Sequence, residues 1–440
     1  MSATKNKNLP AALGGAPVFV QTSESQGKLD QWRQVTEEEA QAVYDMTLNN
    51  ELSGGTPVVR AFEQAWRERH DTRFAISVIN GTSALHSAMF GLGVGPGDEV
   101  ICPSYTWICT IAPAPILMAT PVFCEIDPGT LLIDAEDARR RITERTKAIV
   151  AVHLWGNVCD MDALMKLSEE TGVPIIEDCS HAHGATYKGR PCGSIGHVGA
   201  WSLQGSKPVS GGEGGMVATN DVDAFERACL IGQVNRIVGL DLVTDNYKHL
   251  QPLGLGVKFR AHPLGIGIAS VQLKKLDGLN ERRRKHIEAV EEGIKGLRGV
   301  RPVKKYEGAE SAGFYGFPIH YLPEEMGGLT RAGFVDALNK EGLRAGGNPY
   351  PLLHTLQLFA DGFDIFTGGR GPLCTPEMGG DYRGYNPGDF PISEKVCSQL
   401  VFLPVLSNPV ADAADQVIAA IRKVVAHAEA LAAQHAEAAN

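Results

Sequence analysis

The stretch Lys147–Asp178, which reads KAIVAVHLWGNVCDMDALMKLSEETGVPIIED, decides the fold of this chain. Its two ends, Lys147–His153 and Val173–Asp178, are apolar runs of strand length. Between them, Met161–Thr171 has apolar residues at the spacing of an amphipathic helix. Strand, helix and strand in this order predict two parallel strands joined by a helix that covers them.

The same alternation continues on both sides of this stretch, from about residue 70 to about residue 220. Further strands are predicted at Phe74–Ile79, Glu99–Cys102, Pro121–Ile126, Val198–Ser202 and Met216–Thr219, and further helices at Ser83–Leu92 and Ala135–Ile142. This pattern predicts an α/β fold with a mostly parallel central sheet and helices on both faces. Such a sheet binds ligands at the carboxyl ends of its strands.

The length of 440 residues exceeds that of one common domain, so we expect at least two. We predict an N-terminal extension (1–40), a large α/β domain (41–297) and a smaller C-terminal α+β domain (298–440). The long charged helix predicted at Val271–Leu297 would lead into the last of these. The C-terminal domain would contain a strand at Tyr315–Tyr321, a loop over 361–391 and an alanine-rich helix at Val410–Ala438. The extension has no interpretable motif, and a tail and a dimer arm are equally compatible with it.

Composition excludes several classes of protein. The net charge is −10, with 41 basic and 51 acidic residues and no long basic run, which argues against a nucleic-acid partner. Nine cysteines without a C-x-x-C pair argue against a disulfide scaffold or a thiolate zinc site. The first residues lack the apolar run of a signal peptide, so we expect a cytoplasmic protein. The uncharged stretch Val100–Cys124 contains four prolines, which predicts a buried strand, loop and short helix rather than a membrane span.

The segment Asn80-Gly81-Thr82-Ser83 follows a predicted strand and opens a predicted helix. Backbone N–H groups and hydroxyls at a helix N-terminus suit a phosphate group. The simpler interpretation is that Thr82 or Ser83 only caps the helix, and this segment alone does not decide between the two.

The segment Ile175–His183 (IIEDCSHAH) brings carboxylates and histidines to the end of a buried strand. Asp178 needs a cationic or hydrogen-bonding partner there, because burying an unpaired carboxylate is costly. His181 and His183 are potential metal ligands, but no matching ligand motif occurs elsewhere in the sequence. We therefore predict no metal and interpret them as structural histidines.

The segment Trp201–Pro208 (WSLQGSKP) follows another predicted strand and precedes the glycine-rich run Gly211–Gly215. A lysine held at the carboxyl edge of a sheet can form a Schiff base once burial lowers its pKa. Alone, Lys207 would be interpreted as a solvated surface lysine. The glycine-rich run lacks the Gly-Lys-Ser/Thr ending of a phosphate-binding Walker loop.

Together these segments match the needs of one cofactor, pyridoxal 5′-phosphate. It requires a phosphate cradle, a lysine for its aldehyde, a carboxylate for its ring nitrogen and a group covering the ring. Trp107, in Pro103-Ser104-Tyr105-Thr106-Trp107, is the candidate for the ring cover. Without the other segments, it would be interpreted as a core aromatic.

The ordered set of motifs resembles the DegT/StrS-type sugar aminotransferases, which are fold-type I pyridoxal-phosphate enzymes. The resemblance covers about Gly54 to Val425. It is carried by Gly81-Thr82-Ser83-Ala84-Leu85, Gly97-Asp98-Glu99-Val100, Pro103 to Trp107, Val152-His153-Leu154-Trp155-Gly156, Glu177-Asp178, Ser202 to Lys207, Gly212-Glu213-Gly214-Gly215, Tyr350-Pro351 with His354, and Phe402-Leu403-Pro404. The Ser-Leu-Gln-x-Ser-Lys form around Lys207 is most similar to the inosose and aminohydroxybenzoate branches.

The resemblance implies a role for each site residue. It makes Lys207 the Schiff-base lysine and proton carrier, Asp178 the partner of the ring nitrogen, and His181 a neighbour of the phenolic oxygen. It places Trp107 over the ring, and the remaining residues at the phosphate, namely Gly81, Thr82, Ser83, Ser202 and Gln204. It also implies a homodimer with shared sites, usually completed by a Gly-x-Asn-x-Arg stretch. Here that stretch is Gly256–Arg260, with Lys258 in place of asparagine, a point charge that suits a phosphate.

The resemblance further implies transfer of an amino group from L-glutamine or L-glutamate to a keto-sugar or keto-cyclitol. A dehydratase or lyase on the same scaffold is the nearest alternative, although the related dehydratases carry histidine at the position of Lys207. An aromatising aminobenzoate synthase would keep the lysine and stays open. A non-catalytic cofactor-binding regulator is a third alternative, but the sequence shows no DNA-binding module.

Overall fold

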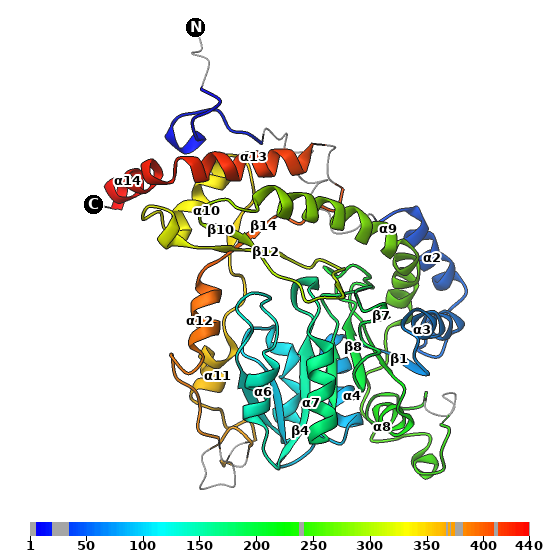
Figure 1. Ribbon diagram of the computed structural model, residues 1–440. Helices are drawn as coiled ribbons and strands as arrows, with labels where there is room; N and C mark the ends of the chain where they lie inside the picture. Colours follow the sequence, from blue (N-terminus) through cyan, green and yellow to red (C-terminus); the bar gives the residue numbers. More distant parts are fainter. Residues whose placement is uncertain are drawn as a thin grey trace.

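The computed structural model describes residues 6–19, 35–236, 242–366, 368–369, 371–374, 382–408 and 412–439. Its centre is a sheet of seven strands in the order β1-β9-β8-β5-β4-β2-β3 (Figure 1). Every strand except β9 runs in the same direction. The strands are β1 (Phe74–Val78), β2 (Glu99–Pro103), β3 (Thr120–Cys124), β4 (Thr146–Val152), β5 (Ile175–Asp178), β8 (Val198–Ser202) and β9 (Gly215–Thr219). Each lies within two residues of its predicted bounds.

Helices cover both faces of this sheet, as predicted. The flanking helices include α4 (Gly81–Gly91), α6 (Ala135–Arg141), α7 (Met161–Thr171) and α8 (Val222–Gly232). The connection through α4 and the connection through α7 cross the sheet in opposite directions. Because such crossovers are right-handed, the two helices lie on opposite faces. In Figure 1, α6 and α7 stand in front of the sheet and α4 behind it.

The uncharged stretch Val100–Cys124 folds as a strand, a loop with short helices, and a second strand. Between β2 and β3 lie the 3₁₀ turn η2 (Ile108–Thr110) and the one-turn helix α5 (Pro113–Ile116). Pro113 stands at the start of α5, where a missing N–H costs nothing. Among the described residues, no helix is both long and apolar enough to cross a membrane.

Helix α9 (Pro263–Ile294) connects two clusters of buried apolar side chains. It begins eight residues before its predicted start, because Pro263 to Ser270 is apolar and lacks the charged pattern of the rest. Its first half contributes Ile266 to the cluster around the large sheet, and its second half contributes Ile294 to the other. Because α9 belongs to both clusters, the domain division at residue 297 stays a prediction.

The second cluster surrounds an antiparallel sheet in the order β10-β12-β14-β13. The alanine-rich helix predicted at Val410–Ala438 is two helices separated at His427, which lets the second pack on α10. The elements here are β10 (Val300–Pro302), β12 (Phe317–Tyr321), β13 (Gly346–Gly347), β14 (Leu400–Leu403), α10 (Arg331–Lys340), α13 (Ala413–Ala426) and α14 (Ala428–Ala439).

Smaller elements complete the chain. A third sheet has the order β11-β6-β7. Its strands are β6 (Thr186–Tyr187), β7 (Arg190–Pro191) and β11 (Ala309–Glu310), and the remaining helices are α2 (Glu37–Leu48), α3 (Pro57–His70), α11 (Gln357–Ala360) and α12 (Pro391–Ser398). The 3₁₀ turns are η1 (Ala11–Leu13), η3 (Leu154–Gly156), η5 (Lys248–Leu250), η6 (Pro323–Glu325) and η7 (Leu353–Thr355). Part of the predicted loop 361–391 lies outside the described residues.

The N-terminal segment 6–19 packs beside α13, at the opposite end of the sequence (Figure 1). The buried carboxylate of Glu341 accepts hydrogen bonds from the N–H groups of Ala11 (2.7 Å) and Val18 (2.9 Å). It also forms an ion pair with Lys423 at 3.0 Å, and Phe19 enters the apolar cluster. This part of the predicted extension is therefore docked rather than a free tail. Helix α2 begins at Glu37, inside the predicted extension.

Replacing Glu341 by alanine is expected to destabilise the protein by about 3–5 kcal/mol, because Lys423, only 8% exposed, would keep a buried charge without its partner. The measurement is the free energy of unfolding from urea titration. The matched control is Asp336→Ala on the same helix, which breaks an exposed pair with Lys340 and should cost at most about 1 kcal/mol. Equal losses in both variants would contradict the docking argument.

Candidate active site

A cavity of about 470 Å³ lies at the carboxyl edge of the parallel strands. Residues from the ends of β1, β2, β4, β5 and β8 line it, and the antiparallel β9 contributes from the segment before its start. The lining residues are Asn80, Gly81, Thr82, Leu85, Thr106, Trp107, Cys109, Thr110, Val152, Asp178, Ser180, His181, Ser202, Gln204, Ser206, Lys207, Glu213, Tyr315 and Tyr350. Six of the predicted site residues thus meet with Gly81 and Thr82 in one cavity, at the edge where the topology predicts a ligand.

The N-terminus of α4 forms one corner of the cavity. Asn80 is the N-cap, and its side chain accepts the N–H of Ser83 at 2.8 Å. Its carbonyl accepts the N–H of Ala84 at 3.1 Å. The two preceding N–H groups, of Gly81 and Thr82, have no partner within the helix and lie at the cavity wall. This corner can therefore receive an anion.

One detail of the prediction for this corner is corrected. The helix begins at Gly81 rather than Ser83, because Asn80 provides the cap. Ser83 is buried and is not among the residues that line the cavity, so its contact with the phosphate stays a prediction. Thr82 and Ser202, by contrast, both reach the wall.

Gly81 and Ser202 approach each other closely across this corner. A Cβ atom added at Gly81 would lie 2.6 Å from Cβ of Ser202, so only glycine fits there. The Ser202 hydroxyl oxygen accepts the N–H of Gln204 at 3.3 Å, which leaves its proton for a ligand. The side-chain oxygen of Gln204 accepts the N–H and the hydroxyl of Ser206 and shapes the turn before Lys207.

Lys207 is buried, with 7% of its surface exposed, and lines the cavity. Its Nζ lies 3.6 Å from the ring centroid of Tyr315. Burial lowers the pKa of Lys207 to about 7, although the charges of Asp178 and Cys109 act in the opposite direction. The lowered pKa favours a neutral, nucleophilic amine near neutral pH, unlike the amine of a solvated surface lysine.

Asp178 ends β5 and is buried beside the same cavity. Thr110 donates its hydroxyl to Oδ2 at 2.9 Å, and the N–H of Ser180 donates to Oδ1 at 3.1 Å. These are the hydrogen-bonding partners that a buried carboxylate needs. They fix the carboxylate at the cavity wall.

The two histidines that follow Asp178 have different surroundings. His181 lines the cavity, stacks on Tyr315 with ring centroids 4.0 Å apart, and accepts the N–H of Trp155 at 3.3 Å. Burial and the charge of Lys207 hold the pKa of His181 well below its usual range, so its ring is neutral. His183 instead packs edge-on to Trp66, and its Nε2 has no hydrogen-bond partner among the described residues.

Trp107 lines the cavity, whereas Lys258 does not. Trp107 lines the cavity with 48% of its surface exposed, and its ring lies 5.2 Å from that of Tyr350. Lys258 is exposed and does not line the cavity of its own chain. A contact of Lys258 with the cofactor of a partner subunit therefore stays a prediction.

Several cavity residues carried no predicted role. Thr110 lies in the uncharged stretch, three residues after Trp107, and no predicted strand end lies beside it to mark it. Tyr315 and Tyr350 come from loops next to the small antiparallel sheet, and no local pattern marks Tyr315. Cys109 and Glu213 are further examples.

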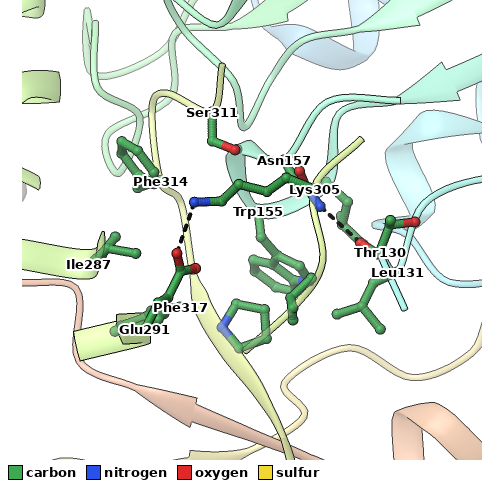
Figure 2. Close-up of a pocket in the computed structure, with 15 residues that line it drawn as sticks. Thr130, Leu131, Trp155, Asn157, Ile287, Glu291, Lys305, Ser311, Phe314 and Phe317 are labelled. Atoms are coloured by element: carbon green, nitrogen blue, oxygen red, sulfur yellow. Dashed lines mark hydrogen bonds and ion pairs between the residues drawn. The ribbon is translucent and has the colours of Figure 1, made fainter. Parts of the chain in front are cut away.

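A smaller cavity of about 40 Å³ is lined by Trp155 and by residues such as Thr130, Ile287 and Phe317 (Figure 2). Lys305 and Glu291 line it and pair with each other at 2.9 Å. This volume suits water and is too small for a cofactor. This small cavity is therefore not a candidate for the cofactor site.

One group among the described residues has the composition of a metal site, namely His153, Glu177 and Cys179, all buried. Glu177 already accepts the N–H groups of Gly193, Ile195 and Gly196, and it binds Nε2 of His153 at 3.0 Å. Because these bonds satisfy the carboxylate, the pair is explained as a link between the end of β4 and β5.

A family model described as the DegT/DnrJ/EryC1/StrS aminotransferase family matches residues 33–367. This is more than half of the chain. The chain belongs to this family. It is therefore a pyridoxal-phosphate-dependent aminotransferase, and the α/β fold is the one expected for fold-type I enzymes.

Relatives of this DegT/StrS-family protein act on several substrates. L-glutamine:2-deoxy-scyllo-inosose aminotransferase of Streptomyces lividus is 34% identical over 66% of this chain and 68% of its own. GDP-perosamine synthase of Caulobacter vibrioides is 40% identical over 49% of this chain and 56% of its own. The crystal structure of 3-amino-5-hydroxybenzoic acid synthase matches with a TM-score of 0.74 and 26% identity, covering 94% of this chain and 100% of that one.

The residues of the cavity fit pyridoxal phosphate. The glycine corner at Gly81, which a Cβ atom would fill, leaves two backbone N–H groups and hydroxyls for the phosphate. Lys207 provides a neutral amine and Asp178 a fixed carboxylate in the same cavity. The cavity volume is within the range of small-molecule sites.

Proposed function

We propose that this aminotransferase moves an amino group from L-glutamine or L-glutamate to a keto-sugar or keto-cyclitol. The observation that carries the proposal is Lys207, a buried amine whose pKa is about 7, in one cavity with the hydrogen-bonded carboxylate of Asp178. An amine of this kind can act as nucleophile and as proton carrier.

Each residue has one task in the proposed mechanism. When bound, pyridoxal phosphate supplies an aldehyde carbon and a ring that accepts electrons from the substrate α-carbon. The N–H groups of Gly81 and Thr82 and the hydroxyl of Ser202 hold the phosphate. Asp178 holds a proton at the ring nitrogen. Lys207 Nζ would take the proton from the α-carbon of the donor, and in the second half-reaction it would give a proton to the carbonyl carbon of the acceptor.

The aromatic residues exclude water and hold the ring in place. His181, neutral and stacked on Tyr315, offers a nitrogen near the proposed position of the phenolic oxygen. Trp107 covers the ring from the open side. Lys207 Nζ lies over the ring of Tyr315, and burial of the amine lowers its pKa, which favours the unprotonated form.

A second cavity of about 470 Å³ offers room for an acceptor. It shares Tyr315 and Tyr350 with the cavity of Lys207, and Trp155 and Phe402 add aromatic walls. Arg344 is the charged residue among those that line it. Aromatic faces beside a cation suit an oxygen-rich ring such as a sugar or cyclitol.

The relatives support this class of acceptor and keep one alternative. The inosose aminotransferase uses a keto-cyclitol with L-glutamine, and the perosamine enzyme makes a GDP-linked amino sugar. The likeness to an aminohydroxybenzoic acid synthase favours the aromatising alternative as the second candidate. Lys207 argues against the dehydratase alternative.

We also propose a homodimer in which the exposed segment around Lys258 meets the partner subunit. Leu253, Leu255 and Val257 expose apolar side chains in this segment, next to the β1 end of the cavity, where Ile79 N–H binds the carbonyl of Phe259. Exposed apolar groups gathered in one segment favour a protein interface.

The test separates the two half-reactions. Purified enzyme loaded with pyridoxal phosphate is mixed with L-glutamine or L-glutamate alone, and conversion to the pyridoxamine form is followed by absorbance. The isolated amino form is then offered a keto-cyclitol, a nucleotide-linked keto-sugar and an aminobenzoate precursor in separate reactions. We expect one of the two donors to convert the bound cofactor to its pyridoxamine form. We expect the keto-cyclitol or the nucleotide-linked keto-sugar to convert it back. Absence of conversion by both donors would refute the donor assignment, and turnover of the third substrate alone would favour the aromatising enzyme.

A further inference from the structure

Three polar side chains form a hydrogen-bonded chain beside the active-site cavity. His354 Nδ1 lies 2.6 Å from the hydroxyl of Ser104, and its Nε2 lies 3.0 Å from a carboxylate oxygen of Glu394. Ser104 and His354 are completely buried. The three residues come from the end of β2, from η7 and from α12, so packing rather than sequence proximity brings them together.

The arrangement resembles a hydroxyl–imidazole–carboxylate relay of a hydrolase, but it cannot act as one here. The hydroxyl of such a relay must reach a substrate carbonyl. Ser104 is fully buried and lines neither the cavity of Lys207 nor the second cavity. A different use must account for these buried polar groups.

The relay holds one end of the loop that carries Trp107. Besides its hydroxyl, Ser104 uses its carbonyl to accept the N–H of Leu353 at 2.8 Å. The same loop places Thr106 3.0 Å from the hydroxyl of Thr110, which donates to Asp178 at 2.9 Å. The position of Ser104 thus sets where the loop places the hydroxyl of Thr110 that donates to Asp178.

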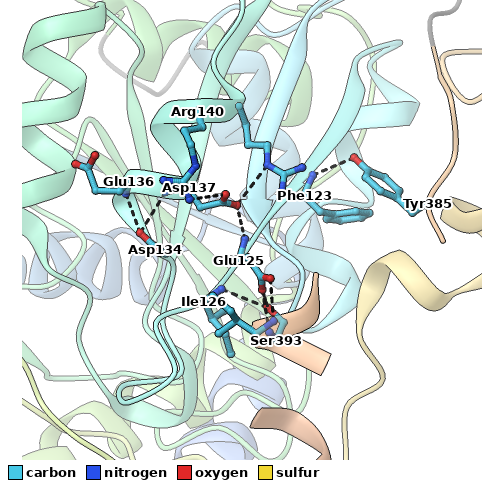
Figure 3. Close-up of polar contacts among 11 residues, drawn as sticks. Phe123, Glu125, Ile126, Asp134, Glu136, Asp137, Arg140, Tyr385 and Ser393 are labelled. Atoms are coloured by element: carbon cyan, nitrogen blue, oxygen red, sulfur yellow. Dashed lines mark hydrogen bonds and ion pairs between the residues drawn. The ribbon is translucent and has the colours of Figure 1, made fainter. Parts of the chain in front are cut away.

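The other end of the relay is fixed by α12. Glu125, at the end of β3, accepts the N–H groups of Ile392 (3.0 Å) and Ser393 (2.8 Å) and also the hydroxyl of Ser393 (Figure 3). These bonds satisfy the N-terminus of α12. Glu394 is the next residue and additionally accepts the N–H of Gly388 at 2.7 Å. The carboxylate of Glu394, which binds His354, is therefore held in place by the anchored N-terminus of α12.

We propose that His354 is a positioning residue, which holds the loop Ser104–Thr110 so that Thr110 orients Asp178 and Trp107 stays over the cavity. The inference rests on the proposed role of Asp178 at the ring nitrogen of the cofactor. His354 itself touches neither cofactor nor substrate. Its effect on the cofactor passes through Ser104.

The test compares His354→Ala with His354→Asn and with the control His286→Ala. The asparagine side chain keeps an acceptor near the position of Nδ1 and can retain the bond to Ser104. His286 is another buried histidine, on α9 and away from the cavity wall. The readouts are the Kd of the apoenzyme for pyridoxal phosphate, the pH dependence of the bound cofactor's absorbance, and kcat and KM for the donor.

We expect His354→Ala to weaken cofactor binding about tenfold and to lower kcat about tenfold, with little change in KM. The reason is that the buried hydrogen bond between His354 and Ser104 is lost and the Ser104 hydroxyl is left unpaired. His354→Asn should recover most of both losses, and His286→Ala should show neither. In His354→Ala the absorbance of the bound cofactor should also titrate at a different pH than in wild type.

Two outcomes would overturn the inference. One is wild-type cofactor affinity and kcat in His354→Ala, and the other is equal loss in all three variants, which would indicate general destabilisation. If His354→Ala does not fold, Ser104→Ala removes the same bond with a smaller change. Cofactor affinity requires no turnover, so this readout decides the inference even where the proposed donor is wrong.

Discussion

Replacing Lys207 by alanine is expected to lower the rate of the donor half-reaction by roughly 10²- to 10⁴-fold, the range that a positioned proton carrier contributes. The physical reason is that Lys207 is the cavity amine whose pKa, about 7, lets it exchange protons at neutral pH. The phosphate corner and Asp178 are untouched, so the variant should still bind pyridoxal phosphate, without a covalent link. The measurement is the single-turnover conversion of bound cofactor with excess L-glutamine or L-glutamate.

The control for this prediction is Lys188→Ala, which removes an exposed lysine paired with Asp162 and should leave the rate unchanged. Added methylamine should restore part of the activity of Lys207→Ala, because a free amine can enter the emptied space and carry the proton. Retention of more than a tenth of the wild-type rate by Lys207→Ala would exclude Lys207 as the proton carrier.

Replacing Asp178 by asparagine is expected to lower the same rate by roughly 100- to 1,000-fold, comparable to the loss of one preorganised electrostatic group in other enzymes. Asparagine keeps the shape of the side chain and an oxygen that can accept from Thr110. It loses the negative charge that would hold a proton at the ring nitrogen. The measurement is again single-turnover conversion, together with the absorbance of the bound cofactor as a function of pH.

Thr110→Val is the matched control for Asp178→Asn. It removes one neutral donor from the carboxylate and leaves the charge, so the rate should fall only about five- to tenfold. Similar losses in both variants would mean that orientation, rather than charge, is the contribution of Asp178.

The strands of the large sheet were predictable because each is a short apolar run with a distinct end. Helix ends were harder to predict, since they depend on single contacts. Helix α4 begins at Gly81, two residues before the predicted start at Ser83, because the side chain of Asn80 caps the helix. Thr36, the N-cap of α2, and Glu39, in the first turn of α2, form a capping box whose role depends on the helix that it starts.

The candidate site was predictable where its residues directly follow strands. Thr82, Asp178 and Lys207 meet because parallel strands share one carboxyl edge. Tyr315 and Tyr350 come from loops beside another sheet, so their arrival depends on packing that no local pattern encodes. Ser83 differs from Thr82 because neighbouring side chains point in different directions along a helix, and its contact with the phosphate stays a prediction.

The docking of residues 6–19 sets an order of events during synthesis. The acceptor for this segment is Glu341, whose partner Lys423 is made only near the end of the chain. Residues 6–19 must therefore wait until Glu341 and Lys423 have both been synthesised before their binding surface exists. This segment is thus among the last parts of the described chain to reach its native place, although it is made long before the residues that bind it.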